Sequence, residues 1–392
     1  EGYNTVGDTT VSGTKDASGN VTAANFTNDL ITVDIAGSKT WVDDSNRYGM
    51  RPAGITLTML ADGVAIDPQP SVSWVKPSGS SVWTYHFADL PRYRKGTTTQ
   101  IVYSVEETPV SDYTLTSASP AVGAVDPTTG DVTEANFTNT LATVSLSGEK
   151  SWSDISNRYA TRPETLTLTV LADSVAMVPQ PVVVWSSDEN TWSYNTSGLP
   201  RYQKGTDTPV VYTVEETPVN GYIPSADGTA DKTATNGKVD KNGNVTAADF
   251  LNTLSTITLT GSKTWADSAN LYGTRPSSLT LTVTADGVDM EPQPSITWAD
   301  TDTDTWTYSI PQLPRYRVGT TTPVVYAVRE TAVNGYTPTT DTTVEGVPDA
   351  VTGDIANVDF TNTLVRARVS GSTHARVARA RCIDSNSPLQ VA

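Results

Sequence analysis

The chain has 392 residues and a formal charge of −17 at pH 7, with nine Trp, sixteen Tyr and a single Cys. An acidic chain of this kind does not fit nucleic acid or anionic lipid as a partner, and no apolar run is long enough to cross a membrane. With Cys382 as its one cysteine, the chain cannot form an intrachain disulfide. Any covalent stapling must therefore use another chemistry.

Repetition is the strongest signal in the chain. The sequences ITVDIAGSKTW, VSLSGEKSW and ITLTGSKTW end at Trp41, Trp152 and Trp265, and their lysines are 111 and 113 residues apart. A closing sequence of the type FTNTL recurs four times, with its Asn at positions 28, 139, 252 and 362. We expect three complete repeats, the closing part of a truncated repeat before them, and a broken fourth repeat with a disordered or artefactual basic tail after them. Their limits are 31–141, 142–254 and 255–364 for the complete repeats, and 1–30 and 365–392 for the flanking parts.

Short alternating segments separated by turn residues indicate β-strands throughout each repeat. No segment has the period and length of an ordinary helix. This pattern is typical of all-β folds, so we expect tandem β-sandwich domains without substantial helix. In the first repeat the expected elements are the strand 31–41, a polar loop closed by Arg51-Pro52, a strand through Ile55 and Met59, a tight turn at Asp62-Gly63, a strand ending at Trp74, a strand from Trp83 into the LPRY sequence at 90–93, and the strands 103–107 and 137–141.

A lysine lies on the apolar face of the first strand of every repeat. Val33, Ile35 and Lys39 alternate with polar residues, so the two-residue period of a strand places Lys39 among core side chains. Burying a lysine is costly unless something in the core pairs or reacts with it. The same parity places a Glu and an Asn on the core faces of two later strands. The three sets are Lys39, Glu107 and Asn139; Lys150, Glu216 and Asn252; and Lys263, Glu330 and Asn362.

Such a set of side chains suits one reaction, in which the Lys amine attacks the Asn side-chain carbonyl, ammonia leaves and an amide joins two strands. Burial disfavours the charged forms of the amine and the carboxyl group. A protonated Glu would donate to the Asn carbonyl oxygen, stabilise the oxyanion and pass a proton to the leaving amine. The alternative is an unreacted ion pair with an amide hydrogen bond. Because buried ion pairs contribute little to stability, their threefold repetition favours the reaction.

The combined pattern of GSKTW, the Arg-Pro loop, LPRYRKG, YSVEETPVSDY and FTNTL resembles the Cna B-type domains of Gram-positive surface adhesins and pilins, across nearly all of residues 31–364. The resemblance implies β-sandwiches related to an inverted immunoglobulin, or prealbumin-like, topology. It also implies an intramolecular Lys–Asn isopeptide bond assisted by an acid. Carried over position by position, the expected bonds join Lys39 to Asn139, Lys150 to Asn252 and Lys263 to Asn362, assisted by Glu107, Glu216 and Glu330.

The resemblance further implies a structural role outside the cell. We expect a stalk of a bacterial cell-surface adhesin, in or on the cell wall, with the secretion signal and anchor outside this segment. Its partners would be the neighbouring repeats and, through a domain outside this chain, a host matrix protein or glycan. We expect no cofactor, no bound metal, no nucleic acid and no membrane insertion. No motif of an enzyme acting on an external substrate occurs, so catalysis would be limited to a single bond-forming turnover per repeat.

Two other functions remain open from the sequence. The aromatic faces or variable loops of a sandwich could hold a glycan or a host protein directly, although Trp83 and Tyr85 alternate as core residues should. A pilus shaft subunit would need a sorting motif and an intermolecular Lys, and neither is identified.

The loop after the first strand holds Asp43, Asp44 and Asn46, which suggests a metal site. The corresponding loops keep too few oxygen ligands for calcium, so we expect an ordinary turn. His86 and His374 have no counterparts in the other repeats, and neither supports a catalytic triad or a metal site.

Overall fold

The structure is a computed structural model that describes residues 1–188, 191–299 and 303–371. Its regular elements are strands, apart from one short 3₁₀ turn, η1 (Asp44–Asn46), so the predicted all-β class is confirmed. No helix in the described residues could span a membrane. The chain divides into two compact units and passes from the first to the second at Ser255 and Thr256, while residues 318–321 belong to the first. His374, Cys382 and most of the predicted basic tail lie outside the described residues.

The first 30 residues form two small hairpins rather than a sandwich. In one hairpin β1 (Tyr3–Val6) runs antiparallel to β4 (Thr27–Leu30), and in the other β2 (Thr14–Lys15) pairs with β3 (Val21–Thr22). All the residues of these strands are exposed, including Asn28. This segment therefore buries no core of its own.

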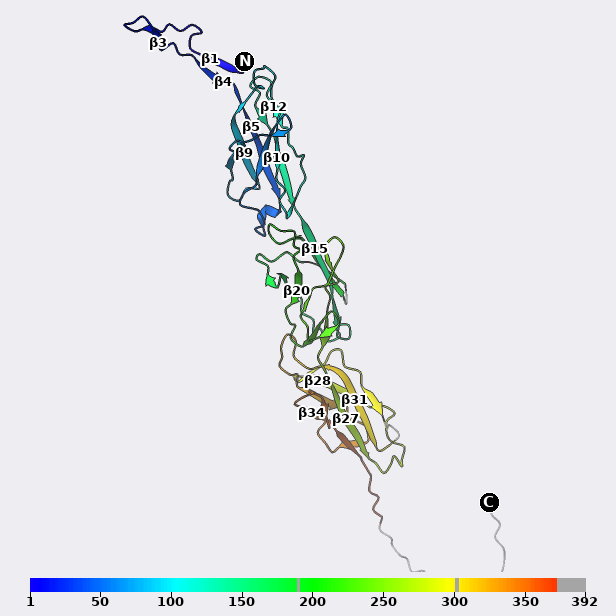
Figure 1. The fold of residues 1–392 in the computed structure, drawn as a ribbon. Helices are drawn as coiled ribbons and strands as arrows, with labels where there is room; N and C mark the ends of the chain where they lie inside the picture. Colours follow the sequence, from blue (N-terminus) through cyan, green and yellow to red (C-terminus); the bar gives the residue numbers. More distant parts are fainter. Residues whose placement is uncertain (189–190, 300–302, 372–392) are drawn as a thin grey trace, which may run out of the picture. The chain divides into compact units, whose positions relative to one another are not determined.

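The first repeat folds into two sheets (Figure 1). At the centre of the larger sheet is β5, which pairs antiparallel with β9 and parallel with β14 and β13. The smaller sheet has the order β10-β6-β7. The strand bounds are β5 (Thr32–Val42), β6 (Leu57–Ala61), β7 (Val64–Ala65), β8 (Ser73–Val75), β9 (Val82–Pro91), β10 (Tyr103–Glu107), β11 (Tyr113–Leu115), β12 (Ala124–Val125), β13 (Val132–Thr133) and β14 (Phe137–Leu141).

The second repeat has the same arrangement around β15, which pairs antiparallel with β19 and parallel with β26 and β25. Its smaller sheet has the order β17-β16-β20-β23. The strand bounds are β15 (Thr143–Ser153), β16 (Leu168–Ala172), β17 (Val175–Ala176), β18 (Val184–Ser187), β19 (Thr191–Pro200), β20 (Tyr212–Glu216), β21 (Tyr222–Ala226), β22 (Thr229–Ala230), β23 (Ala234–Thr235), β24 (Lys238–Val239), β25 (Val245–Thr246) and β26 (Phe250–Leu254).

In the third repeat the central strand is β27, paired antiparallel with β31 and parallel with β37 and β36. The smaller sheet has the order β29-β28-β32-β34. The strand bounds are β27 (Thr256–Ala266), β28 (Leu281–Ala285), β29 (Val288–Asp289), β30 (Thr297–Ala299), β31 (Thr305–Pro314), β32 (Tyr326–Glu330), β33 (Tyr336–Pro338), β34 (Thr343–Glu345), β35 (Val347–Pro348), β36 (Ile355–Ala356) and β37 (Phe360–Leu364).

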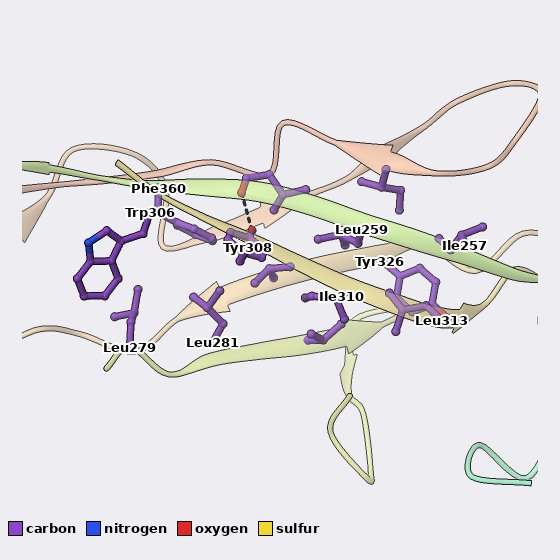
Figure 2. Close-up of a cluster of buried hydrophobic side chains, with 14 of the residues drawn as sticks. Ile257, Leu259, Leu279, Leu281, Trp306, Tyr308, Ile310, Leu313, Tyr326 and Phe360 are labelled. Atoms are coloured by element: carbon purple, nitrogen blue, oxygen red, sulfur yellow. Dashed lines mark hydrogen bonds between the residues drawn. The ribbon is translucent and has the colours of Figure 1, made fainter. Parts of the chain in front are cut away.

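Each core forms between the two sheets of one repeat. In the third repeat Leu259 and Ile310 come from the larger sheet (Figure 2). Val283 and Val328 come from the smaller sheet, and all four side chains are fully buried. Their alternation with outward residues is the two-residue period expected of strands with one buried face. The packing of both inner faces into one cluster makes each repeat a β-sandwich.

A glycine and a tyrosine bring the central and closing strands close together. Gly37 lies directly opposite Tyr85, whose hydroxyl donates a hydrogen bond to the carbonyl oxygen of Ala135, just before β14. A Cβ on Gly37 would lie 2.1 Å from that oxygen and 2.6 Å from the tyrosine ring, so only glycine fits. Gly148 with Tyr194 and Gly261 with Tyr308 repeat the contact. The glycine two residues before each strand lysine thus allows the closing strand to approach.

The tight turn expected at Asp62-Gly63 is present between β6 and β7, with φ of 50° and 80°. Two successive positive φ values are typical of the two-residue hairpin turn that Asp-Gly favours. The Pro-Gln-Pro segment that follows is held by its glutamine. The Gln69 side chain accepts a hydrogen bond from the backbone N–H of Met59 and donates to the Met59 carbonyl, as a paired strand would.

Candidate functional site

The lysine of each central strand points into the sandwich, as its parity predicts. Lys39 on β5, Lys150 on β15 and Lys263 on β27 are at most 1% exposed. The neighbours two residues away on β5, Gly37 and Trp41, share the inward face, so the amine lies among aromatic and apolar groups.

The smaller sheet supplies the carboxylate. Glu107 ends β10, and its oxygens Oε1 and Oε2 lie 2.8 and 2.7 Å from Lys39 Nζ. The corresponding distances are 2.8 Å between Lys150 Nζ and Glu216 and 2.7 Å between Lys263 Nζ and Glu330. The outward neighbours of these glutamates, Glu106, Glu215 and Arg329, are exposed.

The closing strand supplies the amide. Because β14 runs parallel to β5 with Asn139 opposite Trp41, the asparagine lies on the same inward face as the lysine two residues earlier. Asn139 Nδ2 donates to Glu107 Oε1 at 2.6 Å. The corresponding bonds, Asn252 to Glu216 and Asn362 to Glu330, are both 3.0 Å. One carboxylate thus bridges the amine and the amide in all three repeats, and we call each such set the Lys–Glu–Asn site.

The amide orientation differs from the sequence-based expectation. We expected the Glu to donate to the Asn carbonyl oxygen, but it is the Asn nitrogen that faces the carboxylate. The Oδ1 atoms of Asn139, Asn252 and Asn362 are buried without a hydrogen-bond partner. The Glu oxygen accepts the hydrogen bond from the amide N–H, and the amide oxygen faces away from it.

Burial lowers the pKa of all three lysines. Desolvation disfavours the ammonium form and outweighs the opposing hydrogen bonds and charges of Glu107 and Glu330, so the pKa values of Lys39 and Lys263 lie below the ordinary value. For Lys150 the same desolvation, opposed by Glu216, gives a pKa of about 8. A lysine with a lowered pKa reaches the neutral, nucleophilic form near neutral pH.

An indole ring encloses each amine. The distance from Lys39 Nζ to the centroid of the Trp41 ring is 4.7 Å, and it is 4.9 Å for both Lys150 with Trp152 and Lys263 with Trp265. Trp41 in turn packs edge-on against Trp83 and Tyr113, with ring centroids 5.1 and 4.9 Å apart. This aromatic cluster keeps water from the Lys–Glu–Asn site.

A second buried ionic group, the Asp–Arg–Tyr cluster, lies just beyond each central strand, and the sequence-based prediction missed it. Arg51 donates two hydrogen bonds of 2.6 Å to the carboxylate of Asp43, which also accepts one from the Tyr113 hydroxyl. The other clusters are Asp154, Arg162 and Tyr222, and Asp267, Arg275 and Tyr336. The Asp-to-Arg spacing of eight residues in every repeat was the available signal.

The cluster accounts for the acidic loop that follows the first strand. Asp43 accepts a hydrogen bond from the backbone N–H of Asn46 and caps the 3₁₀ turn η1, so the expected turn is present. Its carboxylate oxygens are taken up by Arg51 and Tyr113.

The interpretation of the tryptophans as core residues is confirmed. All nine lie in the described part of the chain, and each is buried or partly buried. An exposed tryptophan face of the kind that stacks on sugars is therefore absent from those residues. His86 is partly exposed and contacts Asp34 at 3.0 Å.

The Cna protein B-type domain matches this chain three times, at residues 35–133, 146–237 and 259–357. The chain belongs to this family. The matches together cover more than half of the residues and confirm the resemblance that the motifs indicated. Each match begins within a central strand that carries one of the buried lysines.

Several known proteins are similar to the chain. The collagen adhesin of Staphylococcus aureus is 28% identical over 333 residues, which are 84% of this chain, and the chain spans 24% of the adhesin's length. The crystal structure of two B repeat units of the collagen binding protein of Staphylococcus aureus is 23% identical and covers 93% of this chain and 81% of its own, with a TM-score of 0.29. The major pilin protein of Streptococcus pyogenes is 14% identical, with coverages of 57% and 99% and a TM-score of 0.30.

Proposed function

We propose that each Cna B-type repeat locks itself with one isopeptide bond and that the chain is part of the stalk of a bacterial cell-surface adhesin. The observation that carries this proposal is the threefold meeting of a buried amine, carboxylate and amide. The bonds join Lys39 to Asn139, Lys150 to Asn252 and Lys263 to Asn362. Glu107, Glu216 and Glu330 are the assisting acids.

The proposed step is an amide exchange. In the reactive form the single proton shared by the amine and the carboxyl group lies on Glu107, which leaves Lys39 neutral. Nζ attacks Cγ of Asn139, the C–N bond to Nδ2 breaks, and Nδ2 leaves as ammonia after taking one proton from Glu107. Glu107 regains a proton from Nζ, which keeps one hydrogen as the new amide N–H. The carboxylate touches both nitrogens, as this transfer requires.

Proximity makes the reaction feasible once per repeat without an external catalyst. Amine and amide are held on adjacent parallel strands by the sheet hydrogen bonds, so the step is unimolecular. The aromatic cluster keeps water away from the reacting atoms, which strengthens the electrostatic effects inside the site. The role is therefore structural, with no external substrate.

The mechanical consequence follows from the strands that the bond would join. Tension that enters β5 near Thr32 would pass at Lys39 into Asn139 and leave along β14, so the loop of about 100 residues between them would carry no load. The same loop closure restricts the unfolded chain and stabilises each repeat by roughly 4–5 kcal/mol in the entropy treatment. A stalk that holds a distal domain away from a cell wall needs such resistance.

The named relatives support the location outside the cell. They include a collagen adhesin and a pilin, both of which are structural surface proteins rather than enzymes. A host matrix protein would be bound through a domain outside this chain. Retention of this chain itself on immobilised collagen or polysaccharide would contradict the assignment of ligand binding to another domain.

Peptide mapping tests the bonds individually. Digestion of the full chain is expected to yield three branched peptides, each containing one of the proposed Lys–Asn pairs and lighter by about 17 Da than the sum of its two linear peptides. A chain with Asn139→Ala should lose the first branched peptide and keep the other two. Linear peptides at all three sites in the unaltered chain would show that the Lys–Glu–Asn sites are unreacted polar clusters.

A further inference from the structure

The same pair of polar atoms lacks a hydrogen-bond partner beside every Lys–Glu–Asn site. In every repeat the asparagine Oδ1 and the indole Nε1 of the tryptophan that encloses the lysine are buried without a hydrogen-bond partner. The tryptophans are Trp41, Trp152 and Trp265, all at least nine-tenths buried. A buried polar atom without a partner costs stability. The same two atoms in all three repeats therefore require a reason.

The two side chains lie next to each other. Asn139 is the residue directly opposite Trp41 in the parallel pairing of β14 with β5, so the two side chains leave the sheet on the same face. Asn252 with Trp152 and Asn362 with Trp265 have the same register. The lysine amine is 4.7–4.9 Å from the indole centroid in each repeat. The indole ring thus borders the place where amine and amide meet.

The proposed reaction needs a hydrogen-bond donor to the Asn Oδ1 atom, and Glu107 does not supply it. When Nζ attacks Cγ of Asn139, the C=O double bond opens and negative charge develops on Oδ1. Glu107 contacts the two nitrogens, so it serves the proton transfer and is turned away from that oxygen. An indole N–H is a donor only and has no competing acceptor here.

We propose that the indole N–H of Trp41, Trp152 and Trp265 is the oxyanion donor of the bond-forming reaction in its repeat. This inference rests on the proposed isopeptide function. As Oδ1 becomes negative it receives the Nε1–H hydrogen bond, and the bond persists to the product amide oxygen. No proton leaves the indole. Ammonia is released as before, so the atoms balance. The two unpartnered atoms of the unreacted site become partners along the reaction path, which favours the transition state over the ground state.

The experiment follows bond formation in the full chain, with repeats two and three as internal controls. Chains are recovered in denaturant after a brief pulse of synthesis and diluted into folding buffer, and the branched peptide of each repeat is quantified with time. Trp41→Phe keeps an aromatic ring but removes the N–H, and should slow bond formation in the first repeat about 100-fold. The other two repeats should react at their usual rates.

A second variant separates the N–H from the packing of the ring. Site-specific replacement of Trp41 by benzothienylalanine keeps the bicyclic shape and exchanges the N–H for sulfur, so it should slow the first repeat to a similar extent. Protease protection of the first repeat measures its folding separately. Trp74→Phe is the matched control, because Trp74 packs edge-on against Trp83 with ring centroids 6.2 Å apart and lies outside the aromatic cluster around Lys39, so it should leave the rate unchanged.

The outcomes distinguish this inference from the function on which it rests. Slow bond formation in both Trp41 variants, with folding and the other repeats unaffected, supports the donor. A benzothienylalanine chain that reacts at the usual rate, or a Trp74→Phe chain that is equally slow, overturns the donor while the isopeptide function stands. An unaltered chain that forms no branched peptide in any repeat overturns both.

Discussion

Every repeat buries two ionic groups near the end of its central strand, and they differ in what they leave unpaired. In the Asp–Arg–Tyr cluster of the first repeat, both carboxylate oxygens of Asp43 accept hydrogen bonds from Arg51, and Tyr113 adds a third. In the Lys–Glu–Asn site, Asn139 Oδ1 and the neighbouring Trp41 Nε1 have no partner. The carboxylate of the first group is fully hydrogen-bonded, whereas the second group leaves one donor and one acceptor without a partner.

The titration behaviour follows the same division. Arginine does not deprotonate in proteins, and hydrogen bonds from Arg275 and other donors outweigh burial and hold the pKa of Asp267 well below its ordinary value. Burial lowers the pKa of Lys150 to about 8 against the opposing effect of Glu216. Where Arg faces Asp, the carboxyl pKa is lowered and both charges are kept, whereas where Lys faces Glu, the pKa of the lysine is lowered and its charge is more easily lost.

Glu107→Gln should have the largest effect on the Lys–Glu–Asn site of the first repeat. Glutamine keeps the shape but cannot carry protons between the two nitrogens, so the first repeat should form no bond. Loss of the covalent loop should lower the free energy of unfolding of that repeat by roughly 4–5 kcal/mol. Denaturant unfolding followed by protease protection of each repeat measures this, with the second and third repeats as controls. A Glu107→Gln chain that still yields the first branched peptide would remove the glutamate from the mechanism.

Arg51→Ala should act on stability and leave the bond in place. This change leaves the buried carboxylate of Asp43 without its cationic partner. Removing one partner of a buried pair lowers the free energy of unfolding by about 3–5 kcal/mol. Denaturant unfolding of the first repeat gives the loss, and peptide mapping should still find Lys39 joined to Asn139. Arg94→Ala is the matched control, because its pair with Asp62 is exposed and should contribute little. Loss of the branched peptide in Arg51→Ala would show that the two ionic groups are not independent.

The smallest effect is in the pH dependence of bond formation. The proposed reaction of the second repeat needs one proton on the pair of Lys150 and Glu216, and the pair loses it as the pH rises through the Lys150 pKa of about 8. The rate of bond formation in that repeat should therefore fall about tenfold per pH unit above this value. Time courses of the second branched peptide from pH 6 to pH 10 measure it. A rate that rises through pH 8 and then levels off would show that only a neutral lysine is needed.

The rate of folding of the second repeat should not fall above pH 8 as the rate of bond formation does. Burial alone would raise the pKa of Asp154, but the hydrogen bonds from Arg162 and other donors outweigh it and hold the pKa below its ordinary value. The Asp–Arg–Tyr cluster of the second repeat therefore keeps its charges from pH 6 to pH 10. Protease protection of the second repeat should develop at a similar rate throughout this range.

Strand parity predicted which side chains point inward, because a two-residue period needs no knowledge of the neighbouring strands. It assigned Lys39, Glu107 and Asn139 to the core, and the structure brings all three together. Whether they react stays a prediction. The alternation of Trp83 and Tyr85 likewise predicted their burial in the sandwich.

Features that depend on the pairing of distant strands could not be predicted from the sequence. The parallel register that sets Asn139 opposite Trp41 is one, and with it the orientation of the amide. The need for Gly37 is another, because it arises from Ala135, almost 100 residues away. The eight-residue spacing from Asp43 to Arg51 was visible, but the third partner, Tyr113, comes from another strand.

The intact mass of the denatured full chain tests the central claim most directly. Each bond releases one ammonia, so the account predicts a mass about 51 Da below that of the sequence, from three losses of about 17 Da. Triple substitution of Glu107, Glu216 and Glu330 by Gln should restore the full mass of the altered sequence. An unaltered chain whose mass equals that of its sequence would contradict the account, because the Lys–Glu–Asn sites would then be ordinary buried ion pairs.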